Sequence, residues 1–165
     1  YRKEVYDKVG LYNEQLGRTE DNEMSYRIRS AGYQICYSPD IISYQHTRSS
    51  LKGMLKQKYG NGYWVALTMK VCPKCFSIFH FVPFAFVMGI IFTTILGLVG
   101  YPQLAYLMWG AYWLVAILMA LLSVKGEKKN PYQLCLPVLF FMLHISYGIG
   151  SVVGFTKLPF WKYQK

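Results

Sequence analysis

The chain has 165 residues and a formal net charge of +10, and 53% of its residues are hydrophobic. The first 75 residues hold 12 of the 18 Lys and Arg and 7 of the 8 Asp and Glu. No charged residue lies between Lys74 and Lys125, a stretch of 50 residues. Because a soluble surface segment of that length and composition is excluded, the sequence predicts a membrane protein.

The excess of basic residues has two physical explanations. Clustered Lys and Arg can neutralise the phosphates of a nucleic acid, or they can face the anionic lipids of a cytoplasmic membrane surface. The sequence contains no nucleic-acid-binding motif. We therefore expect membrane lipid, and no nucleic acid, among the partners. The chain begins at Tyr1 in what reads as the middle of a domain, so we expect a fragment of a longer protein.

Short elements are predicted in the first 48 residues. Residues 2–9 read as a helix that Gly10 ends. A second helix starts after Thr19, whose hydroxyl is expected to cap it, carries acids in its first turn, and stops at Gly32. Met24, Ile28 and Ala31 would form its buried stripe. Residues 33–37 and 41–45 are predicted to be strands.

A basic amphipathic helix is predicted within residues 49–75, where lysines lie opposite an apolar stripe, as in helices at the lipid interface. Gly60 and Gly62 are expected to interrupt it. At its end, Cys72 and Cys75 have the C-x-x-C spacing of a redox or half-zinc site. A zinc site needs further ligands at matching spacing, which are absent from the sequence. We interpret the pair as plain thiols, with acylation or redox chemistry as alternatives.

Three hydrophobic segments, at about 76–100, 101–124 and 133–156, are predicted to be membrane helices. The first two should form a hairpin with basic flanks in the cytoplasm. The basic C-terminus would then lie on the opposite side, which leaves room for one segment being re-entrant. Gly150 and Gly154 permit close helix contact. His80 and His144 are expected to be neutral and bonded to a neighbouring helix.

Glu20 and Asp21 are the main candidates for chemistry, since a carboxylate at a loop-to-helix junction can accept a proton from an attacking hydroxyl. Spacing alone favours ordinary first-turn helix acids. A wider motif surrounds them. It comprises Val9 to Glu14, Glu20-Asp21, Tyr26 to Arg29, Ala31 to Tyr33, Pro39 and His46.

In order and spacing, this motif resembles the C-terminal part of the catalytic domain of family 2 glycosyltransferases. Tyr12-Asn13 stands where the family usually has Phe-Asp. Residues 57–62 resemble the membrane-proximal segment of bacterial exopolysaccharide members. The resemblance implies an α/β fragment, the C-terminal part of a GT-A-like nucleotide-sugar transferase domain, at 1–48. The interfacial amphipathic helix (49–75) and an all-α transmembrane region of about three helices (76–165) would follow.

The resemblance also implies roles for individual residues. Asp21 matches the general base that deprotonates the acceptor hydroxyl, and Glu20 matches the acid that orients the loop. Arg27 and Gln57 would contact substrate, although a salt bridge from Arg27 to Glu23 or Asp7 is an even alternative. His46 stands where some members place a residue near the diphosphate or its metal, with a capping or core role as the alternative.

The family's nucleotide-binding half, with its paired aspartates, has no counterpart in this sequence, which contains no Asp-x-Asp. We therefore expect a divalent metal, Mg²⁺ or Mn²⁺, with its main ligands in that half, and no activity from this chain by itself. The resemblance implies a multi-pass cell-membrane enzyme with its catalytic part in the cytoplasm. It would transfer sugar, with inversion, from a nucleotide-sugar donor to a lipid-linked or polysaccharide acceptor. The alternative is a non-enzymatic small membrane protein, such as a transporter fragment or an assembly scaffold.

Overall fold

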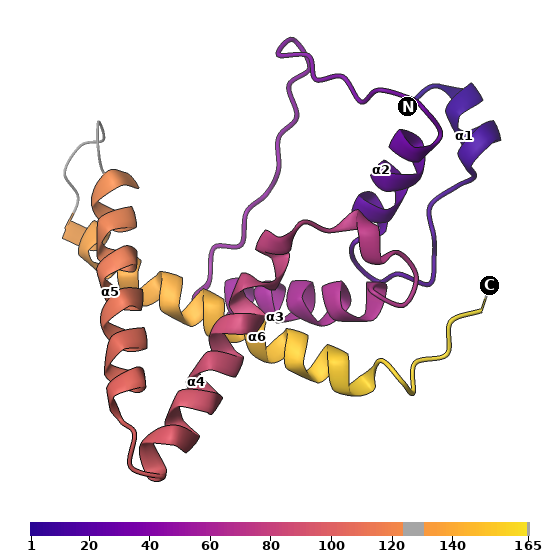
Figure 1. The fold of residues 1–165 in the computed structure, drawn as a ribbon. Coiled ribbons are helices and arrows are strands. Elements are labelled where there is room, and N and C mark those ends of the chain that lie inside the picture. The colour runs from indigo at the N-terminus through magenta and orange to yellow at the C-terminus, as the bar shows by residue number, and fades with distance from the viewer. Residues whose placement is uncertain (124–130, 165) are drawn as a thin grey trace.

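The computed structural model describes residues 1–123 and 131–164. The predicted basic loop with Lys125, Lys128 and Lys129 lies outside them. The described part is built from helices joined by turns and irregular segments (Figure 1). In chain order the elements are α1 Lys3–Val9, α2 Glu20–Ser30, α3 Leu51–Thr68, the 3-10 helices η1 Pro73–Cys75 and η2 Ile78–Phe81, α4 Val82–Leu98, α5 Gln103–Ser123, η3 Pro131–Cys135 and α6 Leu136–Lys157.

The predicted α/β fragment is wrong, because residues 1–123 and 131–164 form no strand. Residues 33–37 and 41–45 belong to a long irregular connection between α2 and α3 (Figure 1). Ile41 is 77% exposed and Tyr44 is 94% exposed, so neither packs in a sheet. Aromatic and β-branched residues favour strands only where a sheet offers pairing partners, and two short strands alone are marginally stable.

The predictions for α1 and α2 are mostly confirmed. Val5 of α1 packs with Met24 and Ile28 of α2, which are 0% and 2% exposed. The chain leaves α2 at Gly32, whose φ of +88° is in the left-handed region. At this end the amide of Tyr33 donates to the carbonyl of Ile28 at 3.2 Å. The apolar spacing of 3.6 residues per turn thus identified the face by which these two helices hold together.

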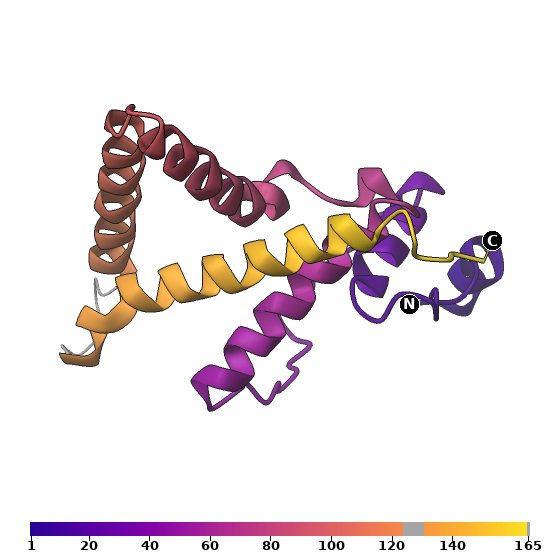
Figure 2. The same cartoon turned by 90° about the horizontal axis from the view of Figure 1, so that it is seen from below.

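Helices α3 and α6 pack side by side in the centre of the molecule (Figures 1 and 2). They run parallel, because their contacts advance together along both helices: Leu55 meets Ser146, Tyr59 meets Gly150 and Tyr63 meets Gly154. At the first of these points the Ser146 hydroxyl donates to the Leu55 carbonyl at 2.8 Å. The helix predicted as interfacial is therefore held along its length by a helix that is long and apolar enough to span a membrane.

The expected interruption of the helix at Gly60 and Gly62 is wrong, because α3 continues through both. Gly62 is buried against α6, and a Cβ there would collide with the carbonyl oxygen of Tyr147. A Cβ at Gly150 would likewise collide with the carbonyl oxygen of Tyr59. Close backbone contact outweighs the roughly 1 kcal/mol that glycine costs in a helix. The glycines thus serve packing, as small residues do between membrane helices.

Three helices are long and apolar enough to cross a membrane, and they lie at Ile78–Leu98, Gln103–Ser123 and Tyr132–Lys157. This confirms the three predicted segments. α4 and α5 form a V whose tip points away from α1 and α2 (Figures 1 and 2). α4 packs on α6 at Gly148, where a Cβ would collide with Pro83 and Val87. Gly148 thus contacts α4 and Gly150 contacts α3, on opposite sides of α6.

His144 links α5 and α6, as predicted for a histidine bonded to a neighbouring helix. The hydroxyl of Tyr112 lies 3.2 Å from Nδ1 of His144, and the Phe140 carbonyl lies 2.9 Å from the same nitrogen. His80 differs from the prediction, because its Nδ1 contacts Ser77 of its own segment at 3.1 Å rather than a neighbouring helix.

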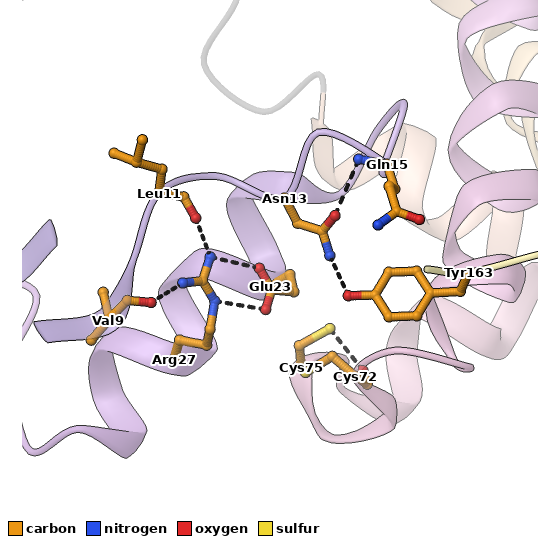
Figure 3. Close-up of polar contacts among 9 residues, drawn as sticks. All are labelled: Val9, Leu11, Asn13, Gln15, Glu23, Arg27, Cys72, Cys75 and Tyr163. Atoms are coloured by element: carbon orange, nitrogen blue, oxygen red, sulfur yellow. Dashed lines mark hydrogen bonds and ion pairs between the residues drawn. The ribbon is translucent and has the colours of Figure 1, made fainter. Parts of the chain in front are cut away.

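The C-terminal tail returns to the loop before α2 (Figure 3). The Asn13 side chain donates to the Tyr163 hydroxyl at 2.9 Å, and the Gln164 amide donates to the Gln15 side chain at 2.9 Å. Lys70 donates to the Trp161 carbonyl at 2.6 Å. The tail therefore connects the loop before α2 to the segment that follows α3.

Candidate active site

A cleft of about 570 Å³ lies where the start of α2 meets α3, η2 and α6. Its size falls within the range of small-molecule sites. Glu20 and Asp21, the two acids singled out from the sequence, both line it. The lining residues are Arg18, Thr19, Glu20, Asp21, Asn22, Gln45, Lys58, Asn61, Val65, His80 and Tyr147.

Thr19 positions the acid pair in an unexpected way. Its φ of +70° lies in the left-handed region, which is rare for a β-branched residue. Its side chain makes no cap to α2, so the predicted N-cap hydrogen bond is wrong. The hydroxyl contacts the Arg18 carbonyl and the hydroxyl of Thr68 instead. Uncommon backbone of this kind is concentrated at functional sites, where surrounding contacts hold it.

The two acids occupy different environments. Asp21 is exposed, and its Oδ1 accepts from the backbone amide of Asn22 at 2.8 Å and from that residue's side chain at 3.2 Å. Glu20 is half-buried, and its Oε2 is a buried oxygen to which no described residue donates a hydrogen bond. A buried unpaired carboxylate oxygen is uncommon in native proteins. The pair therefore combines an accessible carboxylate with one that can still accept a donor.

Two cations, Arg18 and Lys58, line the same cleft as the acids. The Arg18 guanidinium donates to the Asn61 side chain at 2.9 Å, which fixes it against α3. Lys58 lies one turn before Asn61, and within the described ranges it forms no ion pair. A cleft that holds both carboxylates and cations suits a ligand that carries both hydroxyls and phosphate.

Arg27 lies on α2 but does not line the cleft, and its partners are shown in Figure 3. Its Nε donates to Glu23 Oε1 at 2.7 Å and its Nη2 to Oε2 at 3.0 Å, which makes the pair bidentate. The guanidinium also donates to the carbonyls of Val9 and Leu11, the latter at 2.8 Å. The alternative considered from the sequence, a salt bridge to Glu23, is what the structure shows. Substrate binding by Arg27 stays a prediction.

Gln57 and His46 lie beside the cleft rather than in its lining. Gln57 is half-buried on α3 next to Lys58, and His46 is exposed next to Gln45. Among the described residues no three His, Cys, Asp or Glu side chains come together as a metal site. The residues present therefore do not fit a complete metal centre, and the predicted Mg²⁺ or Mn²⁺ ligands in another part of the protein stay a prediction.

Sequence reasoning missed the wall of the cleft opposite the acids. Lys58, Asn61 and Val65 recur at helical spacing on one face of α3. That spacing is visible in the sequence, but nothing local shows that this face meets α2. His80 was noted from the sequence only as a residue bonded to a neighbouring helix, and Tyr147 lies in a segment that was predicted to be a membrane helix. These residues meet only because α3, η2 and α6 pack together.

The two cysteines of the C-x-x-C motif are buried and reduced beside α2. The Cys75 thiol donates to the Cys72 carbonyl at 2.9 Å (Figure 3). Burial, followed by the hydrogen bond and proximity to Cys72, raises the pKa of Cys75 to about 12. Because the thiolate is the reactive form, Cys75 is chemically quiet at neutral pH. The geometry agrees with the interpretation as plain thiols.

Comparison with known proteins identifies two relatives of this chain. The chain is 28% identical over 155 residues, 94% of its length, to dolichyl N-acetyl-alpha-D-glucosaminyl phosphate 3-beta-D-2,3-diacetamido-2,3-dideoxy-beta-D-glucuronosyltransferase of Methanococcus voltae. It is 26% identical over 149 residues, 90% of its length, to succinoglycan biosynthesis protein ExoA of Rhizobium meliloti (strain 1021). It spans 44% of the length of each.

No family model matches the chain, and no solved structure matches it. The matches to curated proteins extend beyond the motif around the acids, because they include the helices that can span a membrane. They confirm the resemblance to glycosyltransferases and are consistent with a fragment of a family 2 member. The chain is thus similar, over nearly all of its length, to glycosyltransferases.

Proposed function

We propose that this chain is part of a membrane-anchored, inverting family 2 glycosyltransferase. The enzyme transfers a sugar from a nucleotide-sugar donor to a lipid-linked or polysaccharide acceptor. The observation that carries the proposal is the position of Glu20 and Asp21. They line a cleft whose other walls come from α3, η2 and α6, so the acids lie beside helices that can span a membrane. An acceptor held at the membrane can reach them there.

Asp21 acts as the general base in this proposal. Its carboxylate takes the proton of the acceptor hydroxyl while that oxygen attacks the anomeric carbon of the donor sugar. The bond from the anomeric carbon to the diphosphate oxygen breaks, and the nucleoside diphosphate leaves with the electron pair. Attack opposite the leaving group inverts the configuration. The exposure of Asp21 supports this role, because the base must reach an incoming hydroxyl.

Glu20 acts beside it as a positioning residue. Its unpaired Oε2 can accept a hydrogen bond from a second hydroxyl of the acceptor sugar, which orients the attacking one. A divalent metal would stabilise the charge on the departing diphosphate. Its main ligands are expected outside the residues described, and no step here is assigned to it. Donor identity, cytoplasmic orientation and multi-pass insertion are parts of the same proposal.

Sugar transfer by the full-length protein, expressed in membranes and supplied with labelled nucleotide sugars, tests this proposal. Asp21→Asn is nearly isosteric but lacks a proton acceptor, and loss of a general base slows reactions by ~10²–10⁴-fold. Glu20→Gln should slow sugar transfer less, since an amide oxygen can still accept a hydrogen bond. Asp7→Asn, an exposed acid on α1, serves as the matched control. If Asp21→Asn and Asp7→Asn transfer sugar at equal rates, Asp21 is only a first-turn helix charge.

A further inference from the structure

The tail that follows α6 lies against the loop that precedes the acids. The Asn13 side chain donates to the Tyr163 hydroxyl at 2.9 Å. The Gln15 side chain accepts from the Gln164 amide at 2.9 Å and donates to the carbonyl of the same residue. Contacts of this kind cannot reach across a hydrocarbon core of about 30 Å. In a protein that crosses a membrane, the tail and the acid-bearing loop are therefore on the same side.

This proximity limits how often the chain crosses a bilayer between the loop and the tail. A chain that starts and ends on one side crosses an even number of times, whereas three of the described helices are long and apolar enough to cross. α3 is not among them, because it carries Lys52, Lys56 and Lys58. Irregular backbone such as residues 33–50 does not cross a hydrocarbon region exposed to lipid. Two of the three candidates cross, or none does.

α4 and α5 have the features of a crossing pair. They form a V whose tip, at residues 99–102, points away from α1 and α2 (Figures 1 and 2). No charged residue lies between Lys74 and Lys125, so the tip carries no charge. Large apolar side chains point outward from both helices, for example Phe92 and Leu114, which are 60% and 70% exposed. A bilayer covers this surface only if α4 and α5 cross it.

α6 differs from these two helices in its position. It closes the open end of the V, between the end of α5 and the start of α4 (Figures 1 and 2). Along this course Ser146 donates to the Leu55 carbonyl of α3, and Gly150 lies against the backbone of Tyr59. The three lysines in the first half of α3 favour the headgroup region over the hydrocarbon core. Because α6 packs along this basic helix, α3 holds it near the membrane surface.

We infer that α4 and α5 cross the membrane as a hairpin, whereas α6 lies with α3 on the membrane surface, on the side that carries the acids. The surface that α3 and α6 form together offers apolar side chains to the lipid and lysines to anionic headgroups. All 18 Lys and Arg of this chain lie outside the hairpin sequence 75–124. The positive-inside rule predicts such a distribution for the cytoplasmic side. The basic C-terminus, which was expected on the opposite side, then obeys the same rule.

Two native cysteines report on this arrangement. Cys36 is exposed on the connection between α2 and α3, and Cys135 is exposed directly before α6. The full-length protein, with one reporter at a time and every other exposed cysteine replaced by Ser, is treated with a membrane-impermeant maleimide in inside-out and right-side-out vesicles. We expect labelling of both cysteines, and of Lys162→Cys in the tail, from one side. Tyr101→Cys, at a tip residue that is 62% exposed, should be labelled from the opposite side.

Every other topology gives a different labelling pattern. Labelling of Cys135 from the side of Tyr101→Cys would show that α6 crosses in place of α5. Labelling of Lys162→Cys from the side opposite Cys36 would show that all three helices cross. Labelling of Tyr101→Cys from the side of Cys36 would show that the hairpin does not cross. Each of these three results overturns the inference.

Spin labels measure how deeply α6 lies in the bilayer. One label is placed at Ile149→Cys of α6, where the native side chain is 44% exposed, and a matched label at Leu114→Cys within α5. Oxygen concentrates in the bilayer centre, whereas a nickel chelate stays in water. We expect the ratio of oxygen to chelate collisions to be several-fold lower at Ile149→Cys than at Leu114→Cys. Equal ratios would place α6 in the hydrocarbon core and overturn the inference.

The inference goes beyond the proposed function, and its test requires no sugar transfer. If the full-length protein transfers no sugar but shows the expected labelling and depth, the proposed function fails and the topology stands. If it transfers sugar while Lys162→Cys is labelled from the side opposite Cys36, the topology alone fails. The two conclusions are therefore tested by separate measurements on the same protein.

Discussion

The hydroxyls of Thr19 and Thr68 lie 2.7 Å apart and are both buried, which joins the start of the acid-bearing helix to the end of α3. Thr68 is 0% exposed, so water does not replace either partner. Thr19 precedes Glu20 directly and holds the left-handed conformation from which α2 starts. This contact is a direct polar link between the acids and the helix pair α3 and α6.

Thr68→Val should therefore impair both stability and transfer. Valine keeps the shape of threonine but leaves the Thr19 hydroxyl without this partner, which costs about 1–3 kcal/mol for a buried group. Thermal unfolding in detergent and sugar transfer in membranes measure the two effects. Thr156→Val is the control, because that hydroxyl is exposed and bonds only within α6. Equal behaviour of the two variants would show that the Thr19–Thr68 contact does not position the acids.

Arg27→Ala tests whether this arginine stabilises the fold or binds substrate. Glu23 is 6% exposed, so loss of Arg27 leaves a buried carboxylate without its cation. We expect a loss of about 2–3 kcal/mol in the free energy of unfolding, less than for a fully buried pair because the Arg27 side chain is 27% exposed.

The double variant Arg27→Met with Glu23→Leu removes both charges and should recover part of the lost stability. A role in substrate binding would give a different result. In that case Arg27→Ala would raise KM for the donor or acceptor with little change in unfolding, and the double variant would not restore KM. Arg29→Ala is the control, since Arg29 is an exposed arginine on the same helix.

The buried thiols offer a test with a defined pH dependence. The pKa of Cys75 is raised to about 12, chiefly by burial, so its thiol stays protonated in the folded protein at pH 8. Cys36 is exposed on the connection between α2 and α3 and should react with a maleimide much faster. Mass spectrometry after short labelling distinguishes the two. Labelling of Cys75 at the rate of Cys36 would contradict the buried position.

The sign of the stability effect follows from the same shift. In the unfolded chain Cys75 loses its proton near the ordinary thiol pKa, whereas in the folded protein it keeps the proton until about pH 12. Between these values the unfolded state binds fewer protons, so stability falls as pH rises. Cys75→Ala should flatten this alkaline loss, which thermal unfolding between pH 7 and pH 10 would measure. An unchanged slope would assign the loss to other groups.

The parts of the fold that were predicted correctly are those encoded by local patterns. The stripe of Met24 and Ile28 and the stop at Gly32 follow from helical periodicity and backbone preference. The three helices that are long and apolar enough to cross a membrane follow from continuous apolar composition. The strands failed because pairing is a nonlocal property, and residues 33–45 have no sheet to join among the described residues.

In the candidate site, too, only the residues within a local motif could be predicted from the sequence. Glu20 and Asp21 could be identified from a motif on one short segment. Lys58 and Tyr147 could not, because they are distant in sequence and meet only through the packing of α3 on α6. The glycines that allow this packing were visible, but a small-residue spacing does not name its partner helix. Gly150 contacts α3 within the same chain, a pairing that periodicity alone does not specify.

Gly150→Ala should disturb the site from a distance. A Cβ at this position would meet the backbone of Tyr59, which cannot move aside as a flexible side chain does, so α3 and α6 must separate. Overpacking of this kind costs about 1–3 kcal/mol. Lys58 and Asn61 lie on α3 and Tyr147 lies on α6, so the same separation alters the cleft. We expect both the unfolding temperature and sugar transfer to fall.

Gly110→Ala is the matched control for this change. Gly110 lies inside α5, and a Cβ there would meet no other atom within 4 Å. Because alanine favours helix over glycine, Gly110→Ala should be neutral or stabilise by up to about 1 kcal/mol. Opposite effects of one methyl group on two helices would show that Gly150 is required for close contact. If Gly150→Ala matched Gly110→Ala in stability and in transfer, α3 and α6 would not pack backbone to backbone, and the wall of the cleft would have to be held by other contacts.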